Sequence, residues 1–574
     1  MKTKRLLQLL CCVCAMLITS QNVNAQNVSE FFGAGEGDGT AADPYQITTG
    51  DQLNAMRNGG ENKCYILMED IDMGAWLADN SPTEGWQPID VFRQTFDGNN
   101  KKLTGFWINH SGGGGLFWQL NTENDVPAIV KDLTIVLDET KGITGGGETG
   151  AIVGKVSGSE DNAFPPVQLI NCHVIGSVTG GGAVGGLVGR AQGVLEIIDC
   201  SFQGKVSGNE IVGGIIGQKY EGRSFFKMTG SYTIDSEITG AWGKAGGLAG
   251  RIGPNSTFEG CYASGGSVTG TNAIGGLIGD WGHDSGSGNL KHVSSMKNCF
   301  TTNSVIGASV VGGLVGEIRI GGGDTPNDDA TERPFAFDIT QSYSAGSVIS
   351  DNDIAGGLVG GYWNANECVM DACYSVASVT VNYGDIGGLI GKTDECKGIE
   401  VKNSYALNPV FSGGVLVGKV QRNDDPINTT FTNCAAFDEL SGNNAHGETI
   451  TFVSKEQAIL QATYAGWDFA STWTFGNGAY KLPVLTGIAN QPTIQPAHLP
   501  YTSTSIAEAQ NNGLKYYVKD NTITLENVNG LVTLTSISGI SQTYEAKGTL
   551  NIPVGVSGVY VLTVKDASYK IAVK

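Results

Sequence analysis

The pentapeptide GGLVG at Gly312–Gly316 is the stretch from which the fold of this chain can be deduced. It recurs along the chain, unchanged or with one or two substitutions, at intervals of 28, 33, 29, 37, 44 and 31 residues. A unit of about 30 residues cannot bury its own apolar face, so it must stack on its neighbours. The copies begin at Gly185, Gly213, Gly246, Gly275, Gly312, Gly356 and Gly387, with looser forms at Gly150 and Gly414.

Each copy continues with a variable stretch, an apolar residue, two further residues, and a slot that holds cysteine or serine. Because serine replaces cysteine in three copies, no slot cysteine needs a fixed partner, and we expect a column of small residues rather than a disulfide framework. Cys368 and Cys396, on neighbouring copies, are candidates for a disulfide, which we leave open. The slot residues are Cys172, Cys200, Ser231, Cys261, Cys299, Ser342, Cys373, Ser404 and Cys434.

Aromatic residues follow the slot in six successive copies, and apolar residues precede it by three positions. Strand alternation would place both columns on one face, unless the polar residue between them forms a turn. The aromatic column is therefore either an internal stack or an exposed stripe that suits carbohydrate. Its members are Tyr232, Tyr262, Phe300, Tyr343, Tyr374 and Tyr405.

Several short strands per copy, tight turns and a period near 30 residues predict one three-stranded coil per copy. Since parallel crossover connections are nearly always right-handed, we expect an all-β chain built on a right-handed parallel β-helix. About eleven coils at ~4.8 Å each would make a rod of roughly 50 Å. Thr49 with Gln52, and Ser454 with Gln457, have capping-box spacing and predict short helices near the two ends of the array.

Composition and charge limit the cellular context. The net charge is −21, which argues against nucleic acid or an anionic membrane as partner. Residues 1–25 have the charged start, apolar run and small-residue cleavage site of a secretory signal; a lipoprotein signal is the alternative. No later stretch has the ~20 consecutive apolar residues of a membrane helix. We therefore expect a secreted or surface-attached protein without a transmembrane segment.

The repeat text also resembles a known family. GGLVG, then NCH or GCYASGGSV, then GGLIG resembles the GLUG repeat of bacterial surface and adhesin-like proteins. DPYQI, DQL and FDGNNKKLTGF are similar to the segment before such repeats, and YAGWDF with TWTFGNGAYKLPVL resembles the end of the array. The resemblance covers about residues 40–487. It implies a secreted β-helix associated with adhesion, and no single activity.

The chain ends in alternating strands after a linker rich in Pro, Thr and Ser. LNIPVGVSGVYVLTV and the terminal KIAVK resemble the C-terminal sorting domain of type IX secretion substrates, a small β-sandwich. That resemblance implies export by the secretion machinery to the outer surface of a Gram-negative bacterium. The chain departs from the family at Gly539-Ile540, where a Gly-Arg pair is usual, and an accessory β-sandwich is the alternative. The expected parts are a signal peptide (1–25), an N-terminal segment with a capping helix (26–60), the repeat β-helix (61–487), a linker (488–511) and the sorting-like domain (512–574).

The unequal repeat intervals predict where a ligand binds. The distance from a slot to the next pentapeptide is nearly constant, whereas the distance from a pentapeptide to the next slot varies from 11 to 26 residues. All insertions should therefore leave the rod at one corner, where binding usually lies in solenoids. Aromatic rings beside charged groups suit a sugar site. The candidates are Trp281, His283, Arg319, Tyr362 and Trp363.

Asp280 and Glu317 directly follow two consecutive pentapeptides, so we expect them to be stacked neighbours with backbones ~4.8 Å apart. Paired carboxyls at such spacing are those of a retaining glycosidase, with Glu317 and Asp280 as acid and nucleophile. The alternative is a ladder of surface charges in which Arg251 offsets Asp280. Acidic turns at residues 324–329, 351–353 and 423–425 offer weak structural calcium sites, and no metal-binding or cofactor motif is present.

The sequence thus favours a β-helical, adhesin-like protein that binds glycans or host proteins through a loop face. The first alternative is a β-helix carbohydrate-active enzyme, a glycoside hydrolase or polysaccharide lyase with paired carboxylates. The second is a purely structural surface protein. The features of the sequence lean away from catalysis and towards binding.

Overall fold

The computed structural model contains two compact units, residues 1–475 with 482–492, and residues 476–481 with 493–574. The expected signal peptide lies outside the residues that the structure describes. Those residues are 27–122, 126–158, 165–220, 224–282, 292–319, 335–365, 367–396, 398–409, 413–421, 429–440, 450–475, 480–499, 515–519, 522–536, 541–554, 558–565 and 567–573.

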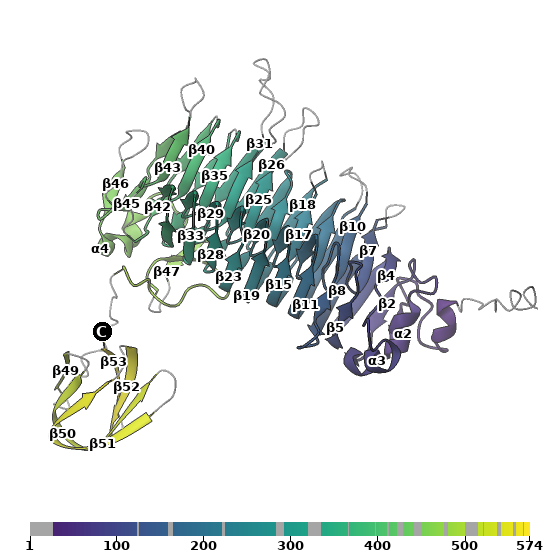
Figure 1. Cartoon of the computed structure of the whole chain (residues 1–574), viewed down its shortest axis with the longest axis horizontal. Helices are drawn as coiled ribbons and strands as arrows, with labels where there is room; N and C mark the ends of the chain where they lie inside the picture. The colour runs from purple at the N-terminus through teal and green to yellow at the C-terminus, as the bar shows by residue number, and fades with distance from the viewer. Residues whose placement is uncertain are drawn as a thin grey trace, which may run out of the picture. The chain divides into compact units, whose positions relative to one another are not determined.

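The first unit is a parallel β-helix, as predicted (Figure 1). Its strands form three parallel sheets, here called A, B and C, and sheet B has 11 strands, which agrees with about eleven coils. Sheet B contains β4 (Ile89–Phe92), β7 (Phe117–Asn121), β10 (Val153–Ser157), β13 (Val188–Ala191), β17 (Ile216–Lys219), β21 (Ala249–Ile252), β25 (Ile278–Gly282), β30 (Val315–Arg319), β35 (Val359–Trp363), β40 (Ile390–Asp394) and β43 (Val417–Gln421). Sheet C contains β12 (Ala183–Gly185), β16 (Ile211–Gly213), β20 (Lys244–Gly246), β24 (Ala273–Gly275), β29 (Val310–Gly312), β34 (Ile354–Gly356) and β39 (Asp385–Gly387).

Sheet A forms the longest wall, and most coils contribute strands to it before and after the slot. The first coils contribute β1 (Tyr45–Ile47), β2 (Tyr65–Leu67), β3 (Ile71–Asp72), β5 (Thr95–Phe106), β6 (Ile108–Asn109), β8 (Ile129–Leu137), β9 (Ile143–Thr144) and β11 (Val167–Gly180). Before the slot lie β14 (Leu195–Ile198), β18 (Phe226–Thr229), β22 (Ser256–Glu259), β26 (His292–Lys297), β31 (Phe335–Thr340), β36 (Val369–Asp371), β41 (Ile399–Lys402) and β44 (Thr429–Thr432). After it lie β15 (Ser201–Gly208), β19 (Tyr232–Gly240), β23 (Tyr262–Thr269), β27 (Phe300–Thr301), β28 (Ser304–Gly307), β32 (Tyr343–Ser344), β33 (Ser347–Ser350), β37 (Tyr374–Ser375), β38 (Ser378–Val381), β42 (Tyr405–Ala406), β45 (Ala435–Phe437) and, last, β46 (Thr451–Val453).

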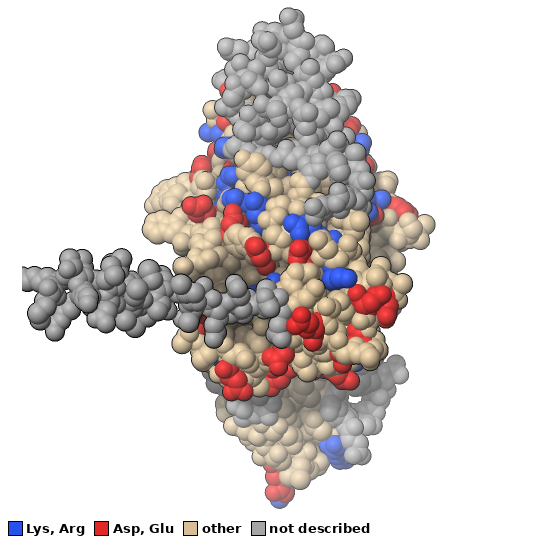
Figure 2. All heavy atoms as spheres, turned by 90° about the vertical axis from the view of Figure 1, so that its right-hand side faces the viewer, with Lys and Arg blue, Asp and Glu red and all other residues tan. Residues whose placement is uncertain are grey.

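Short helices lie near both ends of the array. The N-terminal part has η1 (Val28–Phe31), α2 (Gly50–Ala55) and α3 (Met73–Asn80), and acidic and basic side chains are scattered among uncharged residues over this end of the unit (Figure 2). Both predicted helix starts are confirmed: the Thr49 side chain caps α2, and Ser454 forms a full capping box on α4 (Lys455–Ala458), which precedes η2 (Gln461–Thr463). Within the described residues, no helix is long and apolar enough to cross a membrane.

The pentapeptide glycines let sheet C lie directly against sheet B. A Cβ on Gly276 would lie 2.0 Å from the carbonyl oxygen of Gly313 in the next coil. A Cβ on Gly279 in β25 would lie 2.8 Å from the carbonyl oxygen of Ala245 in sheet C of the preceding coil. Real side chains are excluded at these distances, so glycine is required wherever the corner repeats.

A single turn residue before each slot decides which side chains face inward. This residue has positive φ in every copy, for example 51° at Asn171 and 55° at Asn298. Asn, Asp and Gly tolerate this left-handed conformation, which breaks the strand alternation. As a result the apolar residue three positions earlier and the slot residue both face the core, as fully buried Leu169 and Cys172 show.

None of the nine cysteines in the described part of the chain forms a disulfide. The predicted column of small slot residues is present: the slot serines are fully buried, and the hydroxyl of Ser231 accepts the backbone N–H of Cys200 at 3.0 Å. Cys368 and Cys396 are not joined in a disulfide. Burial raises the pKa of Cys373 and that of Cys396 to about 12, which keeps both protonated and unreactive.

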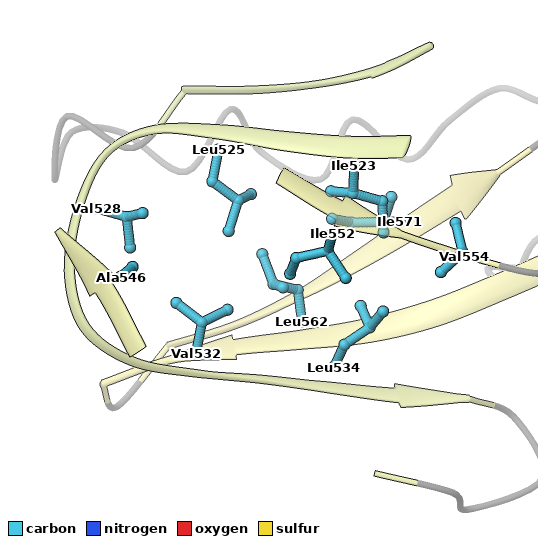
Figure 3. Packing of buried hydrophobic residues seen from close by; sticks show 10 residues of the cluster. All are labelled: Ile523, Leu525, Val528, Val532, Leu534, Ala546, Ile552, Val554, Leu562 and Ile571. Atoms are coloured by element: carbon cyan, nitrogen blue, oxygen red, sulfur yellow. The ribbon is translucent and has the colours of Figure 1, made fainter. Parts of the chain in front are cut away.

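The second unit contains one antiparallel sheet of five strands, folded around a core of its own (Figure 3). Its strands are β49 (Lys515–Lys519), β50 (Thr522–Ser536), β51 (Ser541–Pro553), β52 (Gly558–Val564) and β53 (Ala567–Val573). A bulge between Leu525 and Val528 divides β50, whose first half pairs with β49 and whose second half pairs with β52. The core residues are Ile523, Leu525, Val528, Val532, Leu534, Ala546, Ile552, Val554, Leu562 and Ile571. The expected sandwich is thus a single sheet folded onto itself.

The packing of the corner leads to a prediction about stability. Gly276→Ala should destabilise the β-helix by about 1–3 kcal/mol or more, because the new methyl overlaps the backbone of the next coil. Gly147→Ala is the control, since its nearest neighbour would be 3.8 Å away. Chemical denaturation followed by circular dichroism measures both. Equal stabilities would show that the corner relaxes around the methyl group.

Candidate functional site at the insertion corner

The residues that directly follow each pentapeptide form one ladder on sheet B, here called the charge ladder. Asp280 pairs in register with Arg251 on one side and with Glu317 on the other, so the predicted neighbours are confirmed. Each segment of variable length begins after a sheet B strand and ends before the next sheet A strand, so the described residues that flank these segments lie at one corner beside this ladder. The ladder consists of Lys155, Arg190, Gln218, Arg251, Asp280, Glu317, Gly361, Lys392 and Lys419.

Asp280 is fully buried although it lies on the outer side of sheet B. Its Oδ2 contacts the Lys244 amino group and accepts from Arg251 Nε at 2.9 Å. Lys244 begins β20 in sheet C, and the close contact between sheets C and B brings it over the ladder. The side chains of Lys244 and Asp280 are 11% and 0% exposed, so this ion pair is largely shielded from solvent.

Glu317 is the next rung and is also nearly buried, with 3% of its side chain exposed. It pairs with Nε of Arg319, which lies two positions further along the same strand and therefore on the same face. Arg319 is 40% exposed, and its guanidinium lies 5.9 Å from the ring centroid of Trp363. Arg319 and Trp363 are in register at the ends of β30 and β35.

The Trp363 ring covers Gly361, the position of the charge ladder that has no side chain. Gly361 follows Glu317 in register, and a Cβ on Gly361 would lie 2.1 Å from the Trp363 ring. The indole therefore lies over the Gly361 backbone, beside the guanidinium of Arg319. Together, Glu317, Arg319 and Trp363 bring a carboxylate, a guanidinium and an indole into one partly exposed group at the corner where the insertions begin.

Alternation along the strands places two of the predicted ligand-binding residues in the core and two at the surface. Trp281 and Tyr362 are fully buried and face the core, since they alternate with the outward residues of their strands. Trp281 donates from Nε1 to Ser256 Oγ at 2.7 Å and packs edge-on against Phe337. These two rings hold the core together and cannot meet a ligand at the surface. Arg319 and Trp363 do lie at the surface, and His283 lies outside the described residues.

Lys244 is the one residue of this group that sequence reasoning missed. Its position in sheet C is apolar in most copies, namely Ala183, Ile211, Ala273, Val310 and Ile354. The charge of Lys244 at a position that is apolar in most other copies was the feature of the sequence that could have revealed it. The other exception, Asp385, likewise pairs across the pentapeptide corner, with Lys419 of sheet B at 3.5 Å.

The geometry does not favour the predicted catalytic roles of Asp280 and Glu317. A glycosidase needs both carboxyls open to the glycosidic bond. Here each carboxylate is buried and occupied by a cation, Asp280 by Lys244 and Arg251, and Glu317 by Arg319. The structure instead contains the alternative arrangement, a ladder of charges in which Arg251 lies beside Asp280. Unlike the expected surface ladder, its two carboxylates are buried.

The aromatic column lies on the outer side of sheet A, and the chain itself covers it. Neighbouring rings stack at centroid distances of 4.8–5.2 Å, from Tyr232 to Tyr374. Residues 461–475 and 482–492, here called the strap, return from the end of the array and run back along the sheet A strands that carry these rings (Figure 1). The strap includes β47 (Trp473–Phe475) and β48 (Pro483–Leu485).

Tyrosine hydroxyls anchor the strap at successive coils. Tyr405 donates to the carbonyl of Thr463 at 2.7 Å, and Tyr374 donates to that of Pro483 at 2.8 Å. Tyr343 donates to Gln491 at 3.0 Å, and Asn490 donates to Tyr262 at 2.8 Å. The column is therefore neither an internal stack nor an exposed stripe, because outward rings are buried by a segment from the end of the array. Residues 488–492, expected in the linker, belong to this strap.

The expected calcium sites gain no support from the geometry. Residues 324–329 and 423–425 lie outside the described residues, and Asp353 accepts a hydrogen bond from Ser309 at 3.1 Å. Within the described ranges, no three His, Cys, Asp or Glu side chains come together as a metal-binding group.

Comparisons with known proteins show limited similarity. No protein-family model matches the chain. A protein named "Putative Gly-rich membrane protein" from Evansella cellulosilytica is 32% identical over 160 residues, which make up 27% of this chain and 18% of that protein. The halomucin of Haloquadratum walsbyi is 28% identical over 156 residues, 25% of this chain and 2% of halomucin. The chain thus matches less than a fifth of the length of either relative.

Among solved structures, the chain is similar to one titled "putative immunoglobulin A1 protease" from Bacteroides ovatus. The sequence identity is 17% and the TM-score is 0.31, over 80% of this chain and 97% of that one. The assignment of a parallel β-helix rests on the strand pairing of this chain itself.

The buried tyrosines predict a loss of stability at alkaline pH. Burial, together with nearby Cys434, raises the pKa of Tyr405 to about 12, above the value of about 10 for an unfolded tyrosine. The neutral form is thus favoured in the fold, so its stabilisation is complete below about pH 10 and is lost as pH rises towards 12. We expect Tyr405→Phe to unfold at higher pH than the parent chain, measured by tryptophan fluorescence. An unchanged alkaline midpoint would contradict this.

Proposed function

We propose that this chain is an exported, surface-displayed β-helical protein that binds glycans at the insertion corner. The observation that carries the proposal is the partly exposed group of Glu317, Arg319 and Trp363 beside the segments that vary between coils. Rings stack on the faces of sugars, while charged groups hold their hydroxyls. A constant rod with variable segments at one corner fits recognition, since these segments change without disturbing the coils.

Glycan binding is tested with the full chain on a glycan array, followed by affinity measurements on the best ligand. Trp363→Ala and Arg319→Ala should each weaken binding about tenfold or more, which corresponds to about 1.4 kcal/mol. Trp242→Ala is the matched control, because Trp242 is 78% exposed and lies at the corner between sheets A and C. Equal losses in all three variants would refute the site, and binding of host proteins but no glycan would refute the ligand class.

Glycan cleavage by Asp280 and Glu317 remains the second candidate, and their buried ion pairs weigh against it. Incubating the bound glycan with the chain and looking for shortened products decides between binding and cleavage. A chain that binds neither glycan nor protein would be a structural surface component.

Export is the other half of the proposal. It rests on the signal-like residues 1–25, on the resemblance to GLUG-repeat surface proteins, and on the sorting-like residues 512–574. The second unit supports a separable role because it has a core of its own. We expect removal of residues 512–574 to leave the chain inside cells that otherwise display it, as measured by cell fractionation. Display of the shortened chain would show that these residues are an accessory domain.

A further inference from the structure

The ion pair between Lys244 and Asp280 is more deeply buried than the other ion pairs that cross the pentapeptide corner. Arg190–Glu148 and Lys419–Asp385 do so with side chains 26–51% exposed, so water screens both pairs. In the Lys244–Asp280 pair the exposures are 11% and 0%. Burying a pair of full charges removes their hydration, and hydrogen bonds must offset that loss.

Those hydrogen bonds are incomplete at Asp280. Its Oδ2 meets Lys244 and Arg251, but its Oδ1 is buried without a hydrogen-bond partner among the described residues. A buried carboxylate with one oxygen unsatisfied is unfavourable as an ion. An amide at this position keeps one oxygen, carries no charge, and needs less solvation.

We propose that Lys244 and Asp280 are joined by an intramolecular amide bond. The amine and the carboxyl already touch, and holding two reactants in contact raises their effective concentration by orders of magnitude. The bond would link sheet C of one coil to sheet B of the next, across a sequence separation of 36 residues. This inference is independent of the proposed glycan binding.

The neighbouring side chains supply the chemistry that this bond requires. In this proposal Glu317, which is the in-register neighbour of Asp280 and is paired with Arg319, serves as the base that takes a proton from the Lys244 ammonium. The freed amine attacks Cγ of Asp280, and Arg251 Nε, 2.9 Å from Oδ2, stabilises the negative charge on the departing oxygen. Two protons from the ammonium leave with that oxygen as one water, and Oδ1 stays as the amide carbonyl. No oxidant or further reactant is consumed.

Mass spectrometry of the denatured full chain tests the bond. The wild-type chain should be lighter than its sequence by one water, and its digest should hold a branched peptide that joins the Lys244 and Asp280 segments. Lys244→Arg keeps the charge but cannot form the amide, and it should show the full mass and two linear peptides. Glu317→Gln should lose the bond or form it many times more slowly.

Lys419→Arg is the matched control, since it alters the exposed pair across the same corner and should keep the loss of one water. Linear wild-type peptides containing unmodified Lys244 and Asp280 would overturn the proposal, as would a water loss that persists in Lys244→Arg. The peptide map of the wild-type chain decides the question even if a variant fails to fold.

Discussion

The close approach of backbones at the pentapeptide corner is the constraint on which the rest of this structure depends. Gly276 and Gly279 stand where any Cβ would overlap a neighbouring carbonyl oxygen. Without side chains there, each sheet C strand lies against sheet B of its own coil and of the next. The corner is therefore tight enough to bring Lys244 over Asp280 and to exclude water from both.

A second local constraint, the left-handed residue before each slot, distributes the side chains between core and surface. It interrupts the strand alternation, so that the slot residue and the apolar residue three positions before it are both buried. The residue after the slot then faces outward. The six aromatic residues at that position would leave an apolar stripe on the surface, and large exposed stripes of this kind favour unwanted association. The strap covers most of this stripe with the chain's own residues.

These two constraints narrow the surface that remains for a ligand. The strap occupies the aromatic column, and the ion pairs occupy Asp280 and most of Glu317. What remains at the insertion corner is the outer edge of sheet B, where Arg319 and Trp363 lie side by side and partly exposed. The proposed binding surface is thus confined to positions where the repeat permits variation.

Much of this architecture follows from the sequence alone. The period of the pentapeptide, the slot and the glycines determine a parallel β-helix, its approximate number of coils, the corner where insertions leave, and the register of Asp280 with Glu317. These features are local or periodic, so residue spacing is sufficient to deduce them.

Only the tertiary structure decided burial and partners. One position of strand parity separates Trp281 and Tyr362 in the core from Arg319 and Trp363 at the edge. Lys244 meets Asp280 across 36 residues, and Asn490 meets Tyr262 across 228. Such contacts between distant segments are set by how the coils and the strap pack, which no local pattern of residues encodes.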